Sequence, residues 1–403
     1  MTNPILDAFG NAYLKLALEI DKHIEGYVDA YIGPPQLKVE VSAGGKKKPE
    51  SLIENLRELE ELVPGSDAGR EKYLNAYLRA VDCTLRMLAG EEFEYLDEVE
   101  RLYDVQPKIA PEDEFSEALK QLDSLFPGSG ELDLRYNHWR DQYNIPADKL
   151  PELLASTTAE VRRRTAAFVD LVPGERVKYV YLQGKPWPAN NAYQGGFLSR
   201  IEVNTDVVVN AFNLVNLCAH ECYPGHHTEA QLKEKYLYHD RGYAEEAALL
   251  LQSPDGVTAE AIATTAAELI FPNGSLADWT VEFILPAAGL PEADARQLTE
   301  VQAAMRSLRL VTSNAAIKYH QGDLNREQAI DYLRTNAMMN QQRAEKTFEF
   351  FTHPLYRSYI FSYSEGYQLL ETAAQGGDKR PIFERLLVEQ VLPSDLKKEN
   401  HNE

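Results

Sequence analysis

The sequence predicts a mainly α protein, a multi-helix body with one small β-sheet, and two patterns lead to this fold class. Apolar residues recur at steps of three and four over most of the chain, which is the spacing of an amphipathic helix. The alternation that is typical of strands is confined to a short stretch near the middle of the chain. The order of the elements follows from where each pattern begins and ends.

The first half of the chain carries the helical pattern almost without interruption. Apolar residues from Ile5 to Tyr31 lie on one face and predict a long first helix, which Gly33, Pro34 and Pro35 end. The same spacing predicts further helices over residues 50–62, 69–89, 112–125, 131–143 and 147–171.

The pattern changes near residue 175. Two strands are predicted over 177–183 and 199–205, separated by a loop rich in Gly, Asn and Pro. Helices resume near residue 207, and those after it are predicted over 241–252, 257–271, 275–285, 292–318, 326–336, 339–351, 355–374 and 380–390. We therefore expect an N-terminal helical region, 1–175, and a second helical region with the sheet, 176–403, that form one continuous unit.

Charge and composition restrict the partners. The chain has 41 Lys and Arg against 63 Asp and Glu, a net charge of −22, and nucleic-acid binding depends on basic surfaces. The same net negative charge disfavours binding to an anionic membrane surface. No stretch of the sequence approaches the roughly 18 consecutive apolar residues that a membrane-spanning helix needs. The first thirty residues lack the basic and apolar segments of a signal peptide. We expect a cytoplasmic protein without nucleic-acid or membrane partners. The sequence does not determine its oligomeric state.

One segment carries the chemistry, namely His220-Glu221-Cys222-Tyr223-Pro224-Gly225-His226-His227. Imidazoles and carboxylates are ligands that zinc prefers, and a Glu beside a ligand His can act as a general base. The order is similar to the zinc-binding helix motif H-E-x-x-H, but Pro and Gly precede the second His. A continuous helix would place His226 about 240° around from His220, and His227 about 10 Å further along. A break at Pro224-Gly225 therefore has to bring one of them back, and both stay candidates, with His226 slightly favoured.

A third ligand is expected from a following helix. Glu245 and Glu246 are candidates, and Glu246 lies twenty residues after His226, which suits a simple return of the chain. Glu260 stands in a segment of small and apolar residues, where a buried carboxylate needs a partner such as a metal. Glu268 lies two turns further along the same side and would orient a ligand histidine from behind.

The string His-Glu-x-x-Pro-Gly-His-His resembles the signature of the domain-of-unknown-function 885 family, a group of predominantly helical bacterial proteins. That family has a later Glu-Gly-x-Ala motif on a helix, and here Glu260-Ala261-Ile262-Ala263 stands at that place, with Ala261 in place of Gly. The resemblance extends over 196–205 and 356–367, whereas the first 170 residues match only as a generic helical domain. The family is similar to helical gluzincin-type metallopeptidases.

The resemblance implies a site of His220, Glu221, His226, His227 and Glu260, and it favours Glu260 over Glu246. The resulting hypothesis is a zinc metallopeptidase with one Zn²⁺ ion, held by His220, Glu260 and one of the two later histidines. Glu221 would be the general base, and the substrate would be a peptide or a small amide.

Three further roles complete the hypothesis. Tyr363 would donate a hydrogen bond to the developing oxyanion, and the strand 199–205 would pair with a peptide as an edge strand. Arg200 and Arg357 would bind a substrate carboxylate, as a carboxypeptidase requires. One alternative is a metal-dependent hydrolase of a non-peptide amide or ester. The other is a non-catalytic protein whose structural metal is also bound by Cys218 and Cys222.

Overall fold

Helices make up most of the computed structural model, which describes residues 4–185 and 187–398. Helices hold 61% of the residues and strands 7%, which confirms the mainly α fold class with a small β insertion. Eight helices precede residue 175: α1 Ala8–Asp21, α2 Pro35–Ala43, α3 Pro49–Glu60, α4 Ala68–Leu88, α5 Tyr95–Tyr103, α6 Glu112–Leu125, α7 Leu132–Asp141 and α8 Leu150–Thr165. The predicted helix over 112–125 coincides with α6, whereas α2 and α5 were not predicted.

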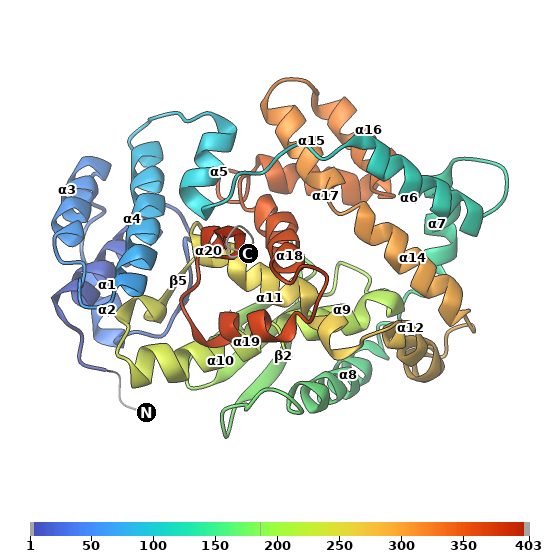
Figure 1. Ribbon diagram of the computed structural model, residues 1–403, viewed down its shortest axis with the longest axis horizontal. Helices are drawn as coiled ribbons and strands as arrows, with labels where there is room; N and C mark the ends of the chain where they lie inside the picture. The colour runs from blue at the N-terminus through green and yellow to red at the C-terminus, as the bar shows by residue number, and fades with distance from the viewer. Residues whose placement is uncertain (1–3, 186, 399–403) are drawn as a thin grey trace.

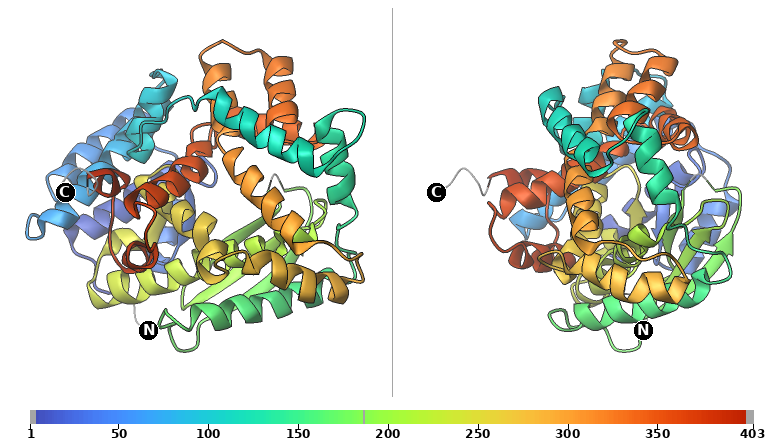
Figure 2. Two further views of the ribbon diagram at one scale, coloured as in Figure 1. Left: turned by 45° about the vertical axis from the view of Figure 1, so that its right-hand side comes forward. Right: turned by 90° about the vertical axis from the view of Figure 1, so that its right-hand side faces the viewer.

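The helices after residue 205 are α9 Ala211–Glu221, α10 His226–Lys233, α11 Pro254–Ile270, α12 Ser275–Trp279, α13 Leu285–Ala288, α14 Ala295–Ser307, α15 Val311–His320, α16 Arg326–Asn336, α17 Gln341–Thr352, α18 Ile360–Ala373, α19 Arg380–Val388 and α20 Pro393–Lys398. A π-helical segment, Glu234–Asp240, extends α10. Figure 1 shows α11 and α18 near the middle of the molecule, with α1 to α5 on one side and α6, α7 and α14 to α17 on the other. In the left view of Figure 2 the first helices, in blue, again lie opposite the helices in teal and orange.

The described residues form two small sheets, where one sheet was predicted. The three-stranded sheet has the order β2–β4–β3, in which β2 (Arg176–Leu182) is parallel and β3 (Ala189–Tyr193) antiparallel to β4 (Leu198–Asn204). Strand β4 is therefore central, and the expectation that 199–205 is an edge strand is wrong. The two edge strands are β2 and β3, and β3 lies in the segment predicted as a loop.

The second sheet pairs β1 (Val28–Tyr31) with β5 (Ala248–Leu250), two segments more than 200 residues apart. Both were predicted to be helical, and both predictions are wrong. Helix α1 ends at Asp21, and only a short 3₁₀ turn, Ala244–Ala247, precedes β5. Apolar residues of short strands give weak periodicity, so the long-range pairing decides their structure. The pairing joins the start of the chain to the middle of it.

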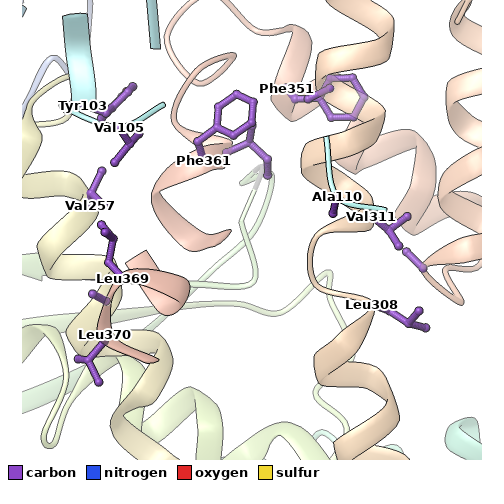
Figure 3. Packing of buried hydrophobic residues seen from close by; sticks show 14 of the residues in the cluster. Tyr103, Val105, Ala110, Val257, Leu308, Val311, Phe351, Phe361, Leu369 and Leu370 are labelled. Atoms are coloured by element: carbon purple, nitrogen blue, oxygen red, sulfur yellow. The ribbon is translucent and has the colours of Figure 1, made fainter. Parts of the chain in front are cut away.

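The largest buried apolar cluster forms around α11 and α18. Figure 3 shows part of it, with Leu369 and Leu370 of α18 beside Val257 of α11. A Cβ atom on Gly366 would lie 2.6 Å from the Val257 carbonyl oxygen and 2.8 Å from the Ala261 nitrogen, so the two helices meet backbone against backbone. This contact needs a small residue at 261 as well, and Ala261 is fully buried there. The close packing fixes α11 relative to α18.

We expect Gly366→Ala to lower the stability of the fold by roughly 1–3 kcal/mol or more, because backbone atoms cannot move aside as a side chain can. Urea denaturation measures this effect. Gly45→Ala is the matched control, because a Cβ atom there meets nothing within 4 Å. Equal midpoints for the two variants would contradict the close packing of α11 and α18.

Within residues 4–185 and 187–398, none of the helices has the combination of length and apolar character that crossing a membrane requires.

Candidate metal and active site

The junction between α9 and α10 brings two histidines together. Helix α9 ends at Glu221, and α10 begins at His226 after a cis Tyr223–Pro224 peptide bond. The Gly225 N–H donates to the Ala219 carbonyl at 2.9 Å, so the chain folds back against the last turn of α9. As a result, the ring centroids of His220 and His226 lie 4.7 Å apart. The sequence suggested residues looped out of one helix, whereas the structure has two helices with a tight reversal between them.

Gly225 makes this reversal possible. A Cβ atom at residue 225 would lie 2.0 Å from the His220 carbonyl oxygen and 2.4 Å from that of Ala219, distances that real Cβ atoms do not adopt. The glycine is therefore needed for close approach of the two backbones, and its φ of −72° is not in the left-handed region.

Glu260 of α11 completes a group of three candidate ligands. His220 Nε2 lies 3.6 Å from Glu260 Oε2, and His226 Nε2 lies 3.7 Å from Glu260 Oε1. One atom from each residue falls within 4.8 Å of the other two. Two ligand atoms on one zinc ion are about 3.3 Å apart, given bonds of about 2.1 Å. The three side chains therefore need only small adjustments to bind a single ion.

The surroundings of Glu260 fit a metal. The residue is 2% exposed, and among the described residues its Oε2 atom has no hydrogen-bond partner. Its other oxygen, Oε1, accepts a hydrogen bond from the Tyr359 hydroxyl at 2.8 Å. A buried carboxylate oxygen without a partner costs free energy, and a cation would remove that cost. Two imidazoles and a carboxylate are a donor set that suits zinc.

Burial and crowding of charges shift the pKa values of this group. Burial raises the pKa of Glu221 to about 7 and that of Glu260 to about 7. Burial, together with the neighbouring His226, lowers the pKa of His220 well below its usual range. Burial alone would also lower the pKa of His226, but Glu229 and the nearby carboxylates outweigh it and raise that pKa to about 9. Excess negative charge therefore collects around His226, as at a site for a cation.

A buried ion network supports His226. Glu229 Oε2 lies 4.0 Å from His226 Nδ1, and Lys233 Nζ lies 2.7 Å from both Glu229 and Asp255. Glu229 was not predicted, although its spacing of three residues from His226 and four from Lys233 on one helix was a usable signal. Asn191 of β3 was also missed; its side-chain N–H donates to the Glu221 carbonyl at 2.6 Å. Nothing in the local sequence indicated that contact.

His227 does not join the group. It is 0% exposed, its Nδ1 lies 2.8 Å from the Ser199 hydroxyl and its Nε2 lies 2.9 Å from a Glu175 oxygen. Glu175 also accepts hydrogen bonds from Tyr223 and Arg162. Both ring nitrogens of His227 are therefore engaged away from Glu260. The structure brings His226 and not His227 beside His220, which is a correction to the inclusion of His227 among the metal ligands.

The other predicted residues divide into two groups. Tyr363, 36% exposed, lines the same cavity as the three candidate ligands and Glu221. Glu268 does not orient a histidine, because it lies 3.6 Å from each of three cations, Arg306, Arg309 and Lys379. Glu245 forms an ion pair with Arg70, and Glu246 accepts from Gln390, so neither joins the candidate ligands.

The two predicted arginines are also bound elsewhere. Arg200 pairs with Glu202, and Arg357 lies 2.8 Å from Glu98. Neither is among the cavity-lining residues that the structure describes. Cys218 and Cys222 are buried beside the Tyr179 hydroxyl, at 3.8 and 3.5 Å, and not with the candidate ligands.

The cavity that contains these groups has a volume of about 260 Å³. Aromatic side chains form part of its wall: Trp187, Phe350, Tyr356, Tyr359 and Tyr363. The edge strand β3 contributes Ala189, Asn190 and Asn191, and β1 contributes Asp29. The site thus combines residues from both ends of the chain with the α9–α10 junction.

We expect His226→Ala to abolish stoichiometric zinc binding, because it removes one of only three donors. His227→Ala should retain the zinc but lower stability by about 1–3 kcal/mol, because Glu175 and Ser199 lose a buried partner. Metal analysis of both purified variants, together with urea denaturation, measures the difference. If only His227→Ala lost the zinc, His227 would be the metal ligand and His226 the structural residue.

Comparison with known proteins gives the fold alone. No family model matches the chain, and no curated protein matches it. A solved structure, named the "putative lipoprotein" from Colwellia psychrerythraea, matches with a TM-score of 0.55 at 15% identity, over 91% of this chain and 69% of that one. A second, a "putative lipoprotein of unknown function" from Shewanella oneidensis, matches with a TM-score of 0.51 at 13% identity, over 98% and 72%. The chain shares its fold with these two proteins.

Proposed function

We propose that this chain is a zinc-dependent hydrolase that cleaves peptide bonds in small substrates. One observation carries the proposal: candidate ligand atoms of His220, His226 and Glu260 lie within 4.8 Å of one another, in a cavity that also contains Glu221. The resemblance of the His-Glu-x-x-Pro-Gly-His-His string to the domain-of-unknown-function 885 family supports the same activity.

Three protein donors are typical of catalytic zinc, whereas structural zinc usually has four protein ligands and often includes thiolates. The position of Cys218 and Cys222, buried with Tyr179 and apart from the three donors, therefore favours a catalytic site over a structural one. When bound, zinc would supply Lewis-acid polarisation of the scissile carbonyl and would lower the pKa of water. The rest of the chemistry falls to side chains of the chain itself.

Glu221 is placed to act as the general base. It follows the ligand His220 directly, lines the cavity, and is not itself one of the three donors. Because burial raises its pKa to about 7, it can take a proton from the attacking water and return it to the leaving amine. Asn191 holds the Glu221 backbone from β3, which restricts the position of this residue.

Tyr363 is placed to stabilise negative charge on the scissile carbonyl oxygen. Burial and the neighbouring Glu260 and Glu221 raise its pKa well above its usual range, so the phenol keeps its proton. A neutral hydroxyl in the cavity wall is a suitable donor for a developing oxyanion. The ring of Tyr359 packs edge-on at 5.6 Å and limits the motion of Tyr363.

The cavity also suggests how a peptide would bind. Strand β3 has an unpaired edge, and its residues Asn190 and Asn191 line the cavity, so an extended peptide can add to it by backbone hydrogen bonds. The volume of about 260 Å³ is near the lower end of the range for small-molecule sites. We therefore propose short peptides as substrates.

Zinc titration combined with a hydrolysis screen tests the proposal. We expect one zinc ion per chain, hydrolysis of short peptides by the loaded protein, loss of activity with a chelator and recovery when zinc is restored. The screen should include peptides, acyl amino acids and esters. Cleavage of esters alone would show a different hydrolase, and zinc binding without cleavage of any compound would contradict a catalytic role.

A further inference from the structure

The cavity has an excess of carboxylates. Of the described residues that line it, eight are acidic: Asp29, Glu221, Glu229, Glu234, Glu245, Glu246, Asp255 and Glu260. Lys233 is the one Lys or Arg among them, and it is neutralised by Glu229 and Asp255 at 2.7 Å. A substrate carboxylate would therefore find no unpaired Lys or Arg side chain among the described wall residues. This electrostatic environment favours a positively charged group.

Most of these carboxylates have partners within the protein. Glu245 pairs with Arg70, Glu234 pairs with His239 and accepts from Gly196 N–H, and Glu246 accepts from Gln390. Glu221 and Glu260 serve the proposed catalytic centre. Asp29 is different, since it is exposed and its carboxylate has neither a hydrogen bond nor an ion pair within the described part of the chain.

The backbone presents Asp29 to the cavity. Val28 pairs with Leu250 and Ala30 with Leu249, so the register between β1 and β5 shifts at Asp29 itself. Such a bulge redirects a side chain and is common beside active sites. Asp29 shares this cavity wall with the proposed base Glu221 and with the candidate ligands His220, His226 and Glu260.

A second group in the wall also lacks a partner. Asn191 is only 9% exposed, and its Oδ1 has no hydrogen-bond partner among the described residues. Its orientation is fixed, because its Nδ2 donates to the Glu221 carbonyl, which can only accept. The Asn191 Oδ1 atom is therefore a buried hydrogen-bond acceptor without a donor among the described residues of the cavity wall. This observation does not depend on the carboxylates.

We propose that the cavity binds a primary ammonium group of the substrate, and that Asp29 is its main contact. An ammonium group brings three N–H donors and a positive charge, which match the free Asp29 carboxylate and the Asn191 oxygen. In a peptide with a free N-terminus, this group is attached to the carbon that carries the first carbonyl. A carboxylate in the same cavity wall as the base and the ligands would thus orient the first peptide bond toward them.

This inference rests on the proposed function and gives its substrate class: short peptides with an unblocked amino group. It replaces the expectation of a carboxypeptidase, because Arg200 and Arg357 bind carboxylates outside the cavity wall. The ammonium group can belong to the N-terminus or to a lysine side chain, and the test separates these two sources.

Four versions of one short peptide, given to the zinc-loaded full chain, test the inference: free at both ends, N-acetylated, C-amidated, and N-acetylated with a lysine. N-acetylation should lower kcat/KM by about tenfold to a hundredfold, the effect of losing a hydrogen-bonded charge. C-amidation should change it by less than about threefold. If the acetylated lysine peptide regains the kcat/KM of the free peptide, the bound ammonium group can be that of a lysine side chain. If it does not, the bound ammonium group is that of the N-terminus. Equal cleavage of the free and N-acetylated peptides would overturn the inference.

Asp29→Asn should remove the difference between the free and N-acetylated peptides, while the zinc content stays at one ion per chain. Asp323→Asn is the matched control, because Asp323 is exposed and lies outside the cavity wall; it should keep the difference. Loss of zinc from Asp29→Asn would make Asp29 a ligand and overturn the inference.

Calorimetric binding of the same peptides to zinc-loaded Glu221→Gln separates this inference from the proposed function. If no peptide is cleaved by the native chain but the free-amine peptide binds at least about tenfold more tightly than the acetylated one, the hydrolase proposal fails and the ammonium site stands. If peptides are cleaved without such a preference, the hydrolase stands and the ammonium site fails.

Discussion

Glu221→Gln is expected to keep bound zinc and to lower kcat by about 10²- to 10⁴-fold, the usual contribution of a general base. Glutamine has the same size as glutamate but cannot accept the proton of water at neutral pH. The hydrogen bond from Asn191 goes to the Glu221 backbone, so the local structure should survive the change. Steady-state kinetics and metal analysis on the same preparation measure both effects.

Glu384→Gln is the matched control, because Glu384 is an exposed residue of α19 outside the cavity. It should have native activity and native zinc content. Unchanged turnover by Glu221→Gln would remove Glu221 from the mechanism. Loss of zinc would instead make it a ligand.

Gly225→Ala should have the largest structural effect of any single methyl group in the site. A Cβ atom 2.0 Å from the His220 carbonyl oxygen forces α9 and α10 apart, so His226 would move away from His220. We expect zinc affinity to fall below detection by titration and stability to drop by more than about 3 kcal/mol. Gly45→Ala, with open space around it, should match the native protein in both measurements. Native zinc affinity in Gly225→Ala would show that the tight reversal does not hold the site together.

The parts of the site that were predictable from the sequence are those that local spacing controls. His220 and Glu221 are adjacent on one helix, and Glu260 stands out because a charged residue interrupts a run of small apolar ones. The choice between His226 and His227 was not predictable, because it depends on the path of the backbone through Pro224 and Gly225. His227 contacts Ser199 and Glu175, which are distant from it in the sequence, so no local pattern around His227 predicts these contacts.

Site residues that reach the cavity through long-range strand pairing could not be predicted from the sequence. Asp29 was assigned to a helix, yet it reaches the cavity because β1 pairs with β5. Asn191 was assigned to a loop, yet it stands on β3 at the edge of the sheet. The role predicted for Glu268 was wrong for a different reason. Its spacing correctly places it two turns beyond Glu260 on α11. Its contacts with Arg306, Arg309 and Lys379, however, follow from the packing of other helices.

In the proposed site, His220, His226 and Glu260 hold one zinc ion beside Glu221. A crystal of the zinc-soaked protein, measured on both sides of the zinc absorption edge, tests this most directly. We expect one anomalous peak, within bonding distance of His220 Nε2, His226 Nε2 and a carboxylate oxygen of Glu260. A peak at Cys218 and Cys222, or none near these three side chains, would contradict it.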